Sequence, residues 1–272
     1  MPKTWKYPVT IVAYPKTPRA YMQKGLIKMN TDVLVNGITL TPKMKKEGKM
    51  SKKAIIDDGC NPELVRGAQF DGIFEIPIIR RPEYFFVPEM IVPFSERNKL
   101  VSRKVAVGFN EMDVNFADVL RNPQKYVEDF GRFGAIISPD CSLYVKAPRS
   151  VQIINTYRNR MIGSFFQRHG LYVIPQIRWG SSATYTTEVF SERVAFLGVE
   201  KHSIVAIGTY GCIQSREEKK TFKSGLHAML ETLEPDVVLV YGPMPRAVFE
   251  DYRDATRFVQ FADWTSRQHG GK

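Results

Sequence analysis

The stretch "SIVAIGTYGCIQSREEKKTFKSGLHAMLETLEPDVVLVYG", residues 203–242, decides the class of fold. It begins with a short apolar run at 203–209, continues with a segment of helical composition at 215–235, and ends with a second apolar run at 236–242. Pro235 follows the expected end of the helix, where proline is common because it cannot continue the helical hydrogen bonds. Two apolar runs joined by one helix are typical of parallel strands with a crossover helix, so the stretch predicts a parallel sheet covered by helices.

The same alternation runs from residue 104 to residue 264. Apolar runs at 104–109, 134–138, 171–179 and 256–264 are further expected strands, and the segments 115–133, 148–170 and 181–199 lie between them. Strands as apolar as these are typical of a sheet that is buried on both faces. We therefore predict an α/β fold with a mainly parallel sheet flanked by helices, and both an incomplete (βα) barrel and an open doubly wound sheet fit this order.

The segment 54–103 has a different composition, with many Pro and Gly residues between short apolar stretches. It is expected to supply one or two further strands and long loops over one end of the sheet. We interpret residues 54–272 as a single α/β domain, with 54–103 as a loop-rich lead-in and 104–264 as the βα units.

The positive charge is concentrated at the N-terminus. Residues 1–53 contain 12 Lys or Arg and two acids, a net +10, and the remaining residues, with 27 and 26, carry only +1. We interpret 1–53 as a basic, partly flexible arm that contacts the phosphates of nucleic acid. An arm that serves assembly, or that adds a strand to a partner, fits the composition equally well. The candidate nucleic-acid-binding residues are Lys43, Lys45, Lys46, Lys49, Lys52 and Lys53.

Several classes of protein are disfavoured by the composition. The sequence has no run of about 18 apolar residues and no signal-peptide core, so we expect no membrane association. Its three cysteines are far apart and form no Cys-x-x-Cys pair, which favours a reducing cytoplasm, the host's in the case of a viral protein. No glycine-rich phosphate loop is present, so the usual nucleotide-binding signatures are absent.

Candidate site residues follow the expected strands, because ligands of parallel α/β sheets bind beyond the carboxyl ends of the strands. Asp140 leaves a buried strand at a Pro-Asp turn, and we expect it to act as a general base or as a ligand of a divalent metal such as magnesium. The catalytic candidates are Asp140, Arg158, Asp113 and Glu111. The substrate-binding candidates are Asn155, Ser142, Tyr144, Trp179, Thr209 and Tyr241.

Arg158 draws attention because of its place in the helical segment 148–170. At about 100° per residue, an apolar sector collects Ile153, Ile154, Tyr157, Met161, Ile162, Phe165 and Phe166, with Arg158 inside it and Gln152, Thr156, Asn159 and Arg160 opposite. A buried guanidinium needs a partner, and Asp140 is the only acid close by in sequence. We predict a buried Arg158–Asp140 pair, which either ties the loop to the helix or binds an anionic substrate.

Four motifs carry a resemblance to a known family. They are "SPDCSLY" (138–144), "NTYRNR" (155–160), "YVIPQIRWG" (172–180) and "IGTYGC" (207–212), and with "VVLVYG" they resemble the uncharacterised domain-of-unknown-function family four-four-one-seven from about Pro93 to Gly242. Its members are typical of phages and other mobile elements, and the resemblance implies no reaction. Cys141 stands where members usually have an aromatic residue, which weakens any case for thiol catalysis.

These observations favour a nucleic-acid-associated protein of a phage or other mobile element, acting on DNA or RNA through the carboxylate-containing crevice. A small-molecule enzyme with an anionic or phosphorylated substrate is one alternative. A non-enzymatic assembly or regulatory protein, working as a homo-oligomer or larger assembly, is the other.

Overall fold

The computed structural model describes residues 33–35, 38–40 and 61–269 of the chain. The chain divides into two units, Met1–Asp58 and Gly59–Lys272. In the first unit, strands β1 (Val33–Val35) and β2 (Ile38–Leu40) pair antiparallel. The six candidate lysines lie outside the described residues.

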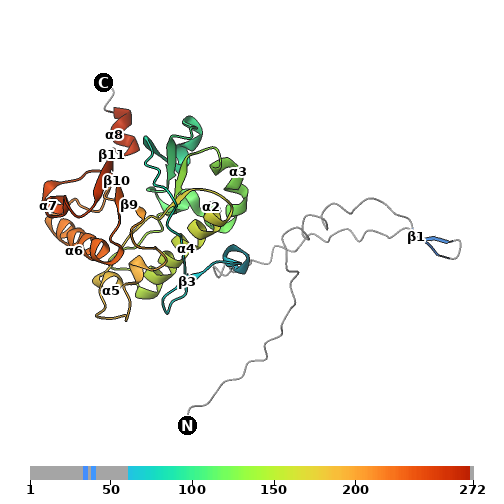
Figure 1. Cartoon of the computed structure of the whole chain (residues 1–272), viewed down its shortest axis with the longest axis horizontal. Coiled ribbons are helices and arrows are strands. Elements are labelled where there is room, and N and C mark those ends of the chain that lie inside the picture. Colours follow the sequence, from blue (N-terminus) through green and yellow to red (C-terminus); the bar gives the residue numbers. More distant parts are fainter. Residues whose placement is uncertain (1–32, 36–37, 41–60, 270–272) are drawn as a thin grey trace, which may run out of the picture. The chain divides into compact units, whose positions relative to one another are not determined.

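The second unit contains the βα architecture (Figure 1). Its strands are β3 (Phe70–Asp71), β4 (Ile76–Pro77), β5 (Met90–Pro93), β6 (Val105–Gly108), β7 (Ala135–Ile137), β8 (Val173–Ile174), β9 (Ile204–Gly208), β10 (Val237–Tyr241) and β11 (Arg257–Phe261). Its α-helices are α2 (Ala117–Arg121), α3 (Val127–Phe130), α4 (Arg149–Arg168), α5 (Ser182–Tyr185), α6 (Arg216–Leu233), α7 (Arg246–Phe249) and α8 (Trp264–His269). Short 3₁₀ helices cover Pro62–Val65, Phe94–Lys99, Asp113–Phe116, Pro123–Tyr126, Val194–Phe196 and Glu250–Tyr252.

The seven strands β5 to β11 are parallel and stand side by side in sequence order. One sheet has the order β5-β6-β7-β8 and the other β9-β10-β11, and a parallel bridge between Gln176 and Ala206 joins them. A doubly wound sheet reverses its strand order at a switch point, whereas a barrel keeps sequence order. The arrangement is thus that of an incomplete (βα) barrel. Its seam lies between β5 and β11, and residues of both strands line a hollow of about 270 Å³ there.

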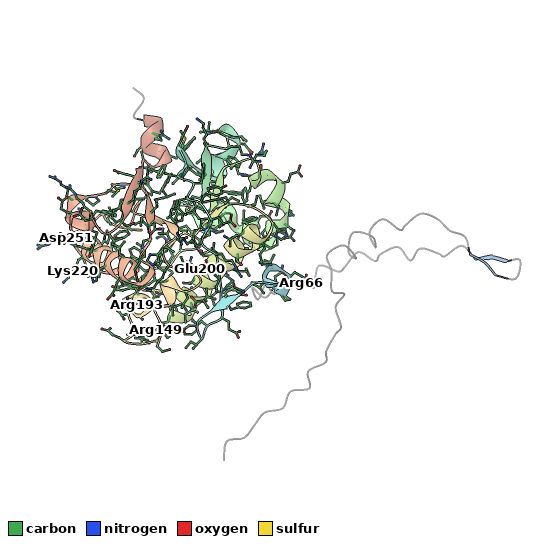
Figure 2. All side chains as sticks on the ribbon, in the orientation of Figure 1. Arg66, Arg149, Arg193, Glu200, Lys220 and Asp251 are labelled. Carbon is green, nitrogen blue, oxygen red and sulfur yellow. The ribbon has the colours of Figure 1, made fainter. Side chains whose placement is uncertain are left out.

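The buried apolar side chains follow the barrel plan. An inner cluster collects one residue or more from each of the seven strands, for example Ile91 of β5, Ile174 of β8 and Phe261 of β11. Two outer clusters lie between strands and helices, one under α6 and α7 and the other under α2, α3 and α4. Charged side chains such as Arg149, Lys220 and Asp251 are exposed on the outside of this unit (Figure 2).

The expected strands are confirmed: each of the six apolar runs contains one of β6 to β11. The lead-in 54–103 supplies β5, the first strand of the barrel, and the small antiparallel pair β3–β4. The two long helices, α4 and α6, lie within the segments expected to be helical. The segments 115–133 and 181–199 form only short helices and turns.

The predicted orientation of α4 is wrong for its first half. Gln152, Thr156, Asn159 and Arg160 are buried, whereas Ile154 is exposed and Arg158 only partly buried. The reason is the irregular backbone after β7 and β8, whose carbonyls need donors. Asn159 Nδ2 donates to Pro139 O (2.7 Å) and Gln176 O (3.1 Å), so this polar face satisfies groups that an apolar face would leave unpaired.

Arg160 is the buried arginine of α4, only 1% exposed. Its guanidinium donates to the carbonyls of Gln176 (2.8 Å), Leu197 (3.0 Å) and Ala195 (3.1 Å). Burial lowers its pKa to about 9. Arg160 therefore fastens α4 to the chain after β8 and to the turn before β9, and it does so through backbone oxygens.

No helix among the described residues is both long and apolar enough to cross a membrane.

Candidate functional site

A pocket of about 960 Å³ opens at the carboxyl ends of β6, β7, β8 and β9. Its walls are the segments that follow these strands, 110–112, 140–146, 177–180 and 208–212, together with the start of α6. In (βα) barrels this face carries the functional residues, because the loops that follow the strands meet there. The pocket thus lies where the sequence predicted a crevice.

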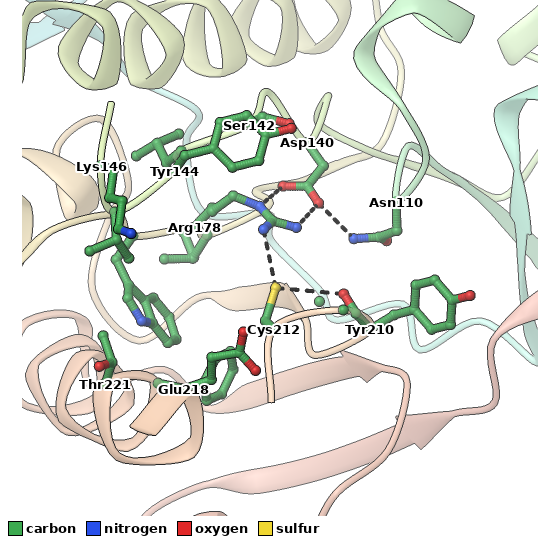
Figure 3. Close-up of a pocket in the computed structure, with 18 of the residues that line it drawn as sticks. Asn110, Asp140, Ser142, Tyr144, Lys146, Arg178, Tyr210, Cys212, Glu218 and Thr221 are labelled. Atoms are coloured by element: carbon green, nitrogen blue, oxygen red, sulfur yellow. Dashed lines mark hydrogen bonds and ion pairs between the residues drawn. The ribbon is translucent and has the colours of Figure 1, made fainter. Parts of the chain in front are cut away.

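An ion pair between Asp140 and Arg178 lies at the floor of the pocket (Figure 3). Arg178 Nε donates to Asp140 Oδ1 (2.5 Å), and Nη2 donates to Oδ2, so the pair is bidentate. Asn110 Nδ2 also donates to Oδ2 (3.0 Å). Burial opposes the charge on Arg178, but the Asp140 carboxylate outweighs it and raises the pKa of Arg178 above its ordinary value. The guanidinium of Arg178 is therefore charged at neutral pH.

The remaining guanidinium nitrogen of Arg178, Nη1, contacts the thiol of Cys212. It donates to Cys212 Sγ over 3.4 Å, and sulfur is a weak acceptor. Gly208 of β9 borders the same place: a Cβ there would come within 2.5 Å of Asn110 Nδ2. The lack of a side chain at Gly208 allows Asn110 to reach the carboxylate.

The α6 side of the pocket is fixed by a capping box. Ser215 Oγ accepts from the Glu218 backbone N–H (3.1 Å), and Glu218 Oε2 accepts from the Ser215 backbone N–H (2.8 Å). These backbone hydrogen bonds lower the pKa of Glu218. Trp179 packs against Phe222 with a centroid distance of 4.8 Å, close over Gly225. The wall on this side is partly aromatic.

Two tyrosines at the pocket are largely exposed. Tyr144 follows β7 and is 70% exposed, and Tyr210 follows β9 and is 57% exposed. Both belong to the pocket lining. In the view of Figure 3, Tyr144 lies above the Asp140–Arg178 pair and Tyr210 below it. A flat ligand entering the pocket therefore finds aromatic faces on two of its segments.

Hydrogen bonds hold the segment 140–146 in place. Asp113 accepts from the Ser142 backbone N–H (3.1 Å) and from Ser142 Oγ (2.7 Å), and Asn155 Nδ2 donates to Ser142 O (2.7 Å). Asp113 and Asn155 thus position the segment that carries Tyr144, but neither lines the pocket.

The structure brings together only part of the predicted set. Glu111, Asp140, Ser142, Tyr144 and Trp179 line the pocket, and Asp113, Asn155, Arg158, Thr209 and Tyr241 do not. Thr209 is fully buried and donates to Pro243 O (2.8 Å). Tyr241 is buried in the inner cluster, where its hydroxyl accepts from the Trp264 backbone N–H (2.9 Å). It is therefore no stacking wall of the pocket.

The predicted Arg158–Asp140 pair is wrong. Arg158 Nη1 has Asn155 Oδ1 as its partner, at 3.4 Å, and the arginine that binds Asp140 is Arg178. Sequence distance misled the prediction, since Arg178 comes from the segment that follows the neighbouring strand, β8. A usable signal existed: Arg178 is four residues after Ile174 in the same run, so the alternation of a strand points both side chains toward the inside of the barrel.

The predicted carboxylates do not form one group. Glu111 accepts from the Ser95 backbone N–H (3.0 Å) and from Asn115 Nδ2 (2.8 Å), and Asp113 is engaged by Ser142. Within the described part of the chain, no three His, Cys, Asp or Glu side chains are placed to hold a metal ion. Asn110, Lys146, Arg178, Tyr210 and Cys212 line the pocket beyond the predicted set.

Comparison with known proteins places the chain in a family. The model of a family described as "Domain of unknown function (DUF4417)" matches residues 68–262, which includes every strand of the barrel. The chain belongs to DUF4417. This agrees with the resemblance carried by the four motifs.

Relatives of this DUF4417 chain are found in phages. It is 28% identical over 193 residues to the Gene 1 protein of Mycobacterium phage L5, which covers 70% of this chain and 80% of that protein. It is also 28% identical over 172 residues to the Gene 1 protein of Mycobacterium phage D29, covering 62% of this chain and 60% of that protein. No solved structure matches the chain. The comparisons therefore support a phage-associated family and no particular reaction.

Proposed function

We propose that this chain binds single-stranded nucleic acid and takes one unpaired base into the pocket at the carboxyl end of the barrel. The observation that carries the proposal is the pairing of a hollow of about 960 Å³ with two largely exposed tyrosines, Tyr144 and Tyr210, on its lining. Pockets for small ligands commonly measure about 300 to 1,000 Å³. Proteins that bind single strands present aromatic faces on which bases stack.

The charge of the lining favours a base over a phosphate. Four carboxylates (Glu111, Asp140, Glu217 and Glu218) and two cations (Lys146 and Arg178) give the lining a formal charge of −2. Arg178 is moreover already paired with Asp140. This lining suits an anionic or phosphorylated small substrate less well, so that alternative is the weaker one.

In this proposal the phosphates are contacted elsewhere, by the basic segment 1–53. This segment, with its net charge of +10, would release counterions when it neutralises the phosphates of the strand. The logarithm of the affinity should then fall with the logarithm of the salt concentration, with a slope of about −0.7 for each phosphate neutralised on a single strand. Replacing Lys43, Lys45, Lys46, Lys49, Lys52 and Lys53 by Gln in the full chain is expected to flatten this salt dependence. An unchanged slope would mean that these lysines do not contact the phosphates.

The pocket itself is tested by stacking variants. Tyr144→Ala and Tyr210→Ala are each expected to weaken binding of a labelled single-stranded oligonucleotide by about 1 to 3 kcal/mol, the usual value of one stacked base. Tyr84→Ala is the matched control, because Tyr84 is 68% exposed and lies outside the pocket lining. Equal affinities for all three variants and the unaltered chain would contradict the proposal.

A further inference from the structure

We infer that the nucleotides next to the inserted base lie on an apolar rim beside the pocket. The inference rests on the proposed function and concerns the strand outside the pocket, whereas the proposed function concerns the one base inside it. The apolar rim consists of six exposed side chains: Met112, Val114, Tyr144, Val145, Val151 and Ile154.

The rim gathers much of the exposed apolar surface of the protein. Twelve large apolar side chains of the described residues are exposed, and these six are half of them, each between 42% and 73% exposed. They come from three short segments, 112–114, 144–145 and 151–154. Single exposed apolar residues need no explanation, but a group of them commonly marks a binding surface.

Hydrogen bonds to Ser142 hold the three segments next to one another. Asp113, in the first segment, accepts from the backbone N–H and from Oγ of Ser142. Asn155, which directly follows Ile154, donates to the Ser142 carbonyl oxygen over 2.7 Å. Val151 and Ile154 are three residues apart in α4 and therefore share one side of the helix. The rim is thus built on neighbouring segments.

The rim continues into the pocket. Met112, Tyr144 and Val145 belong to the pocket lining as well as to the rim. The inserted base is part of a polymer, so the nucleotides on either side of it must leave the pocket over its edge. Unstacked bases are held by contact with apolar side chains as well as with aromatic rings. Neighbouring bases on the rim would therefore cover apolar surface that otherwise stays in contact with water.

The charges beside the rim favour the phosphates of the same nucleotides. Lys146 directly follows the second rim segment, lines the pocket and is exposed, and it has no ion pair or hydrogen bond within the described residues. The two acids on this side, Glu111 and Asp113, are engaged in hydrogen bonds within the protein. In Figure 3, Lys146 lies on the same side of the Asp140–Arg178 pair as Tyr144. We assign Lys146 to a phosphate next to the inserted base, in addition to any contacts of segment 1–53.

The first test measures how much the neighbouring bases contribute to affinity. Two single strands of equal length are compared by fluorescence anisotropy with the full chain. One is made of thymidines, and in the other only the central thymidine keeps its base while the remaining sugars are abasic. The complete strand is expected to bind about fivefold or more tightly, the lower end of what one stacked base contributes.

Rim variants decide whether this difference arises at the rim. In the double variant Val114→Gln, Ile154→Gln the ratio of the two dissociation constants should fall severalfold, because the rim is less apolar while the residues of the pocket lining are unchanged. Val189→Gln is the matched control and should keep the ratio, since Val189 is 44% exposed and lies outside both the rim and the lining.

A second measurement tests the phosphate contact. Lys146→Gln should make the slope of log affinity against log salt shallower by about 0.7, the value for one phosphate of a single strand. Arg257→Gln is the control and should leave the slope unchanged. Arg257 is an exposed cation at the first residue of β11, and the pocket opens at the other, carboxyl end of the parallel strands.

The outcomes separate the inference from the proposed function. A ratio near one in the unaltered chain, or a ratio that the double variant leaves unchanged, would overturn the inference while strand binding by the pocket stands. The rim would then be left to another occupant, such as a protein partner. An unchanged slope in Lys146→Gln would overturn the phosphate contact. If neither strand binds, the proposed function fails as well.

Discussion

Arg178 and Asp140 form a bidentate pair across two neighbouring strand ends, with Nε 2.5 Å from Oδ1 and Nη2 on Oδ2. The carboxylate has only 3% of its side chain exposed. The geometry makes each charge the principal partner of the other. Removing Arg178 leaves the carboxylate buried and uncompensated, whereas removing Asp140 leaves a guanidinium whose side chain is 24% exposed.

The first prediction follows from this dependence. Arg178→Met is expected to lower the free energy of unfolding by about 3 to 5 kcal/mol, since a buried carboxylate is left without its partner, and Asp140→Asn by less, since the guanidinium that it leaves is partly exposed. The double variant should lose clearly less than the sum of the two, as measured by urea denaturation. Additive losses would mean that the two side chains do not depend on each other.

The second prediction concerns Arg160. Arg160→Met leaves the carbonyls of Leu197 and Ala195 without their side-chain donor, whereas Gln176 O keeps Asn159 Nδ2, and unpaired buried carbonyls cost about 1 to 3 kcal/mol each. We expect a loss of about 3 kcal/mol or more in the free energy of unfolding. Arg158→Met, two residues away and only partly buried, is the matched control and should cost about 1 kcal/mol or less. A larger loss for Arg158→Met than for Arg160→Met would instead favour the orientation of α4 that the sequence predicted.

The third prediction compares two thiols. Cys141 is buried, and burial together with the nearby Asp113 and Asp140 carboxylates raises its pKa, so the thiol stays protonated well above the usual value of about 8.5. Cys212 is partly exposed in the pocket. In a Cys60→Ser background, iodoacetamide at mildly alkaline pH should modify Cys212 and spare Cys141 in the folded chain, as read by mass spectrometry. Because the raised pKa belongs to the folded state, unfolding should abolish the difference.

The fourth prediction uses Cys212 as a reporter of the pocket. Its Sγ lies 3.4 Å from Arg178 Nη1, in the pocket that the proposed base would enter. A saturating single-stranded oligonucleotide should therefore slow alkylation of Cys212 severalfold, whereas duplex of the same length, which offers no unpaired base, should have a smaller effect. Unaltered alkylation under saturating strand would mean that the strand binds elsewhere.

The strands of the barrel could be predicted almost completely from the sequence, but which strands are neighbours could not. Continuous apolar runs such as 203–209 and 236–242 are local signals, and each became a strand. Barrel and open sheet differ only in which strands are neighbours, and that depends on contacts such as the bridge between Gln176 and Ala206, far apart in the sequence. The strand β5 was expected only in outline, because its proline and short length make it resemble the loops around it.

The position of the candidate site could be predicted from the sequence, but the arginine that pairs with Asp140 could not. Asp140 was found because a Pro-Asp turn after an apolar run is a local feature. Its partner was missed because apolarity was taken as the sign of the buried face of α4, whereas the buried face carries Asn159 and Arg160, which bind the backbone of the loops. Polar residues that serve irregular backbone look like a solvent face until the loops are seen.

Photocrosslinking tests the central claim, that one unpaired base enters the barrel pocket, most directly. A single strand with one iodocytosine would be irradiated with the full chain and the modified peptides identified by mass spectrometry. We predict adducts on Tyr144 or Tyr210, the exposed aromatic residues of the pocket lining, which an excess of unlabelled strand removes. Competable adducts confined to residues outside 110–112, 140–146, 177–180 and 208–222 would contradict the account.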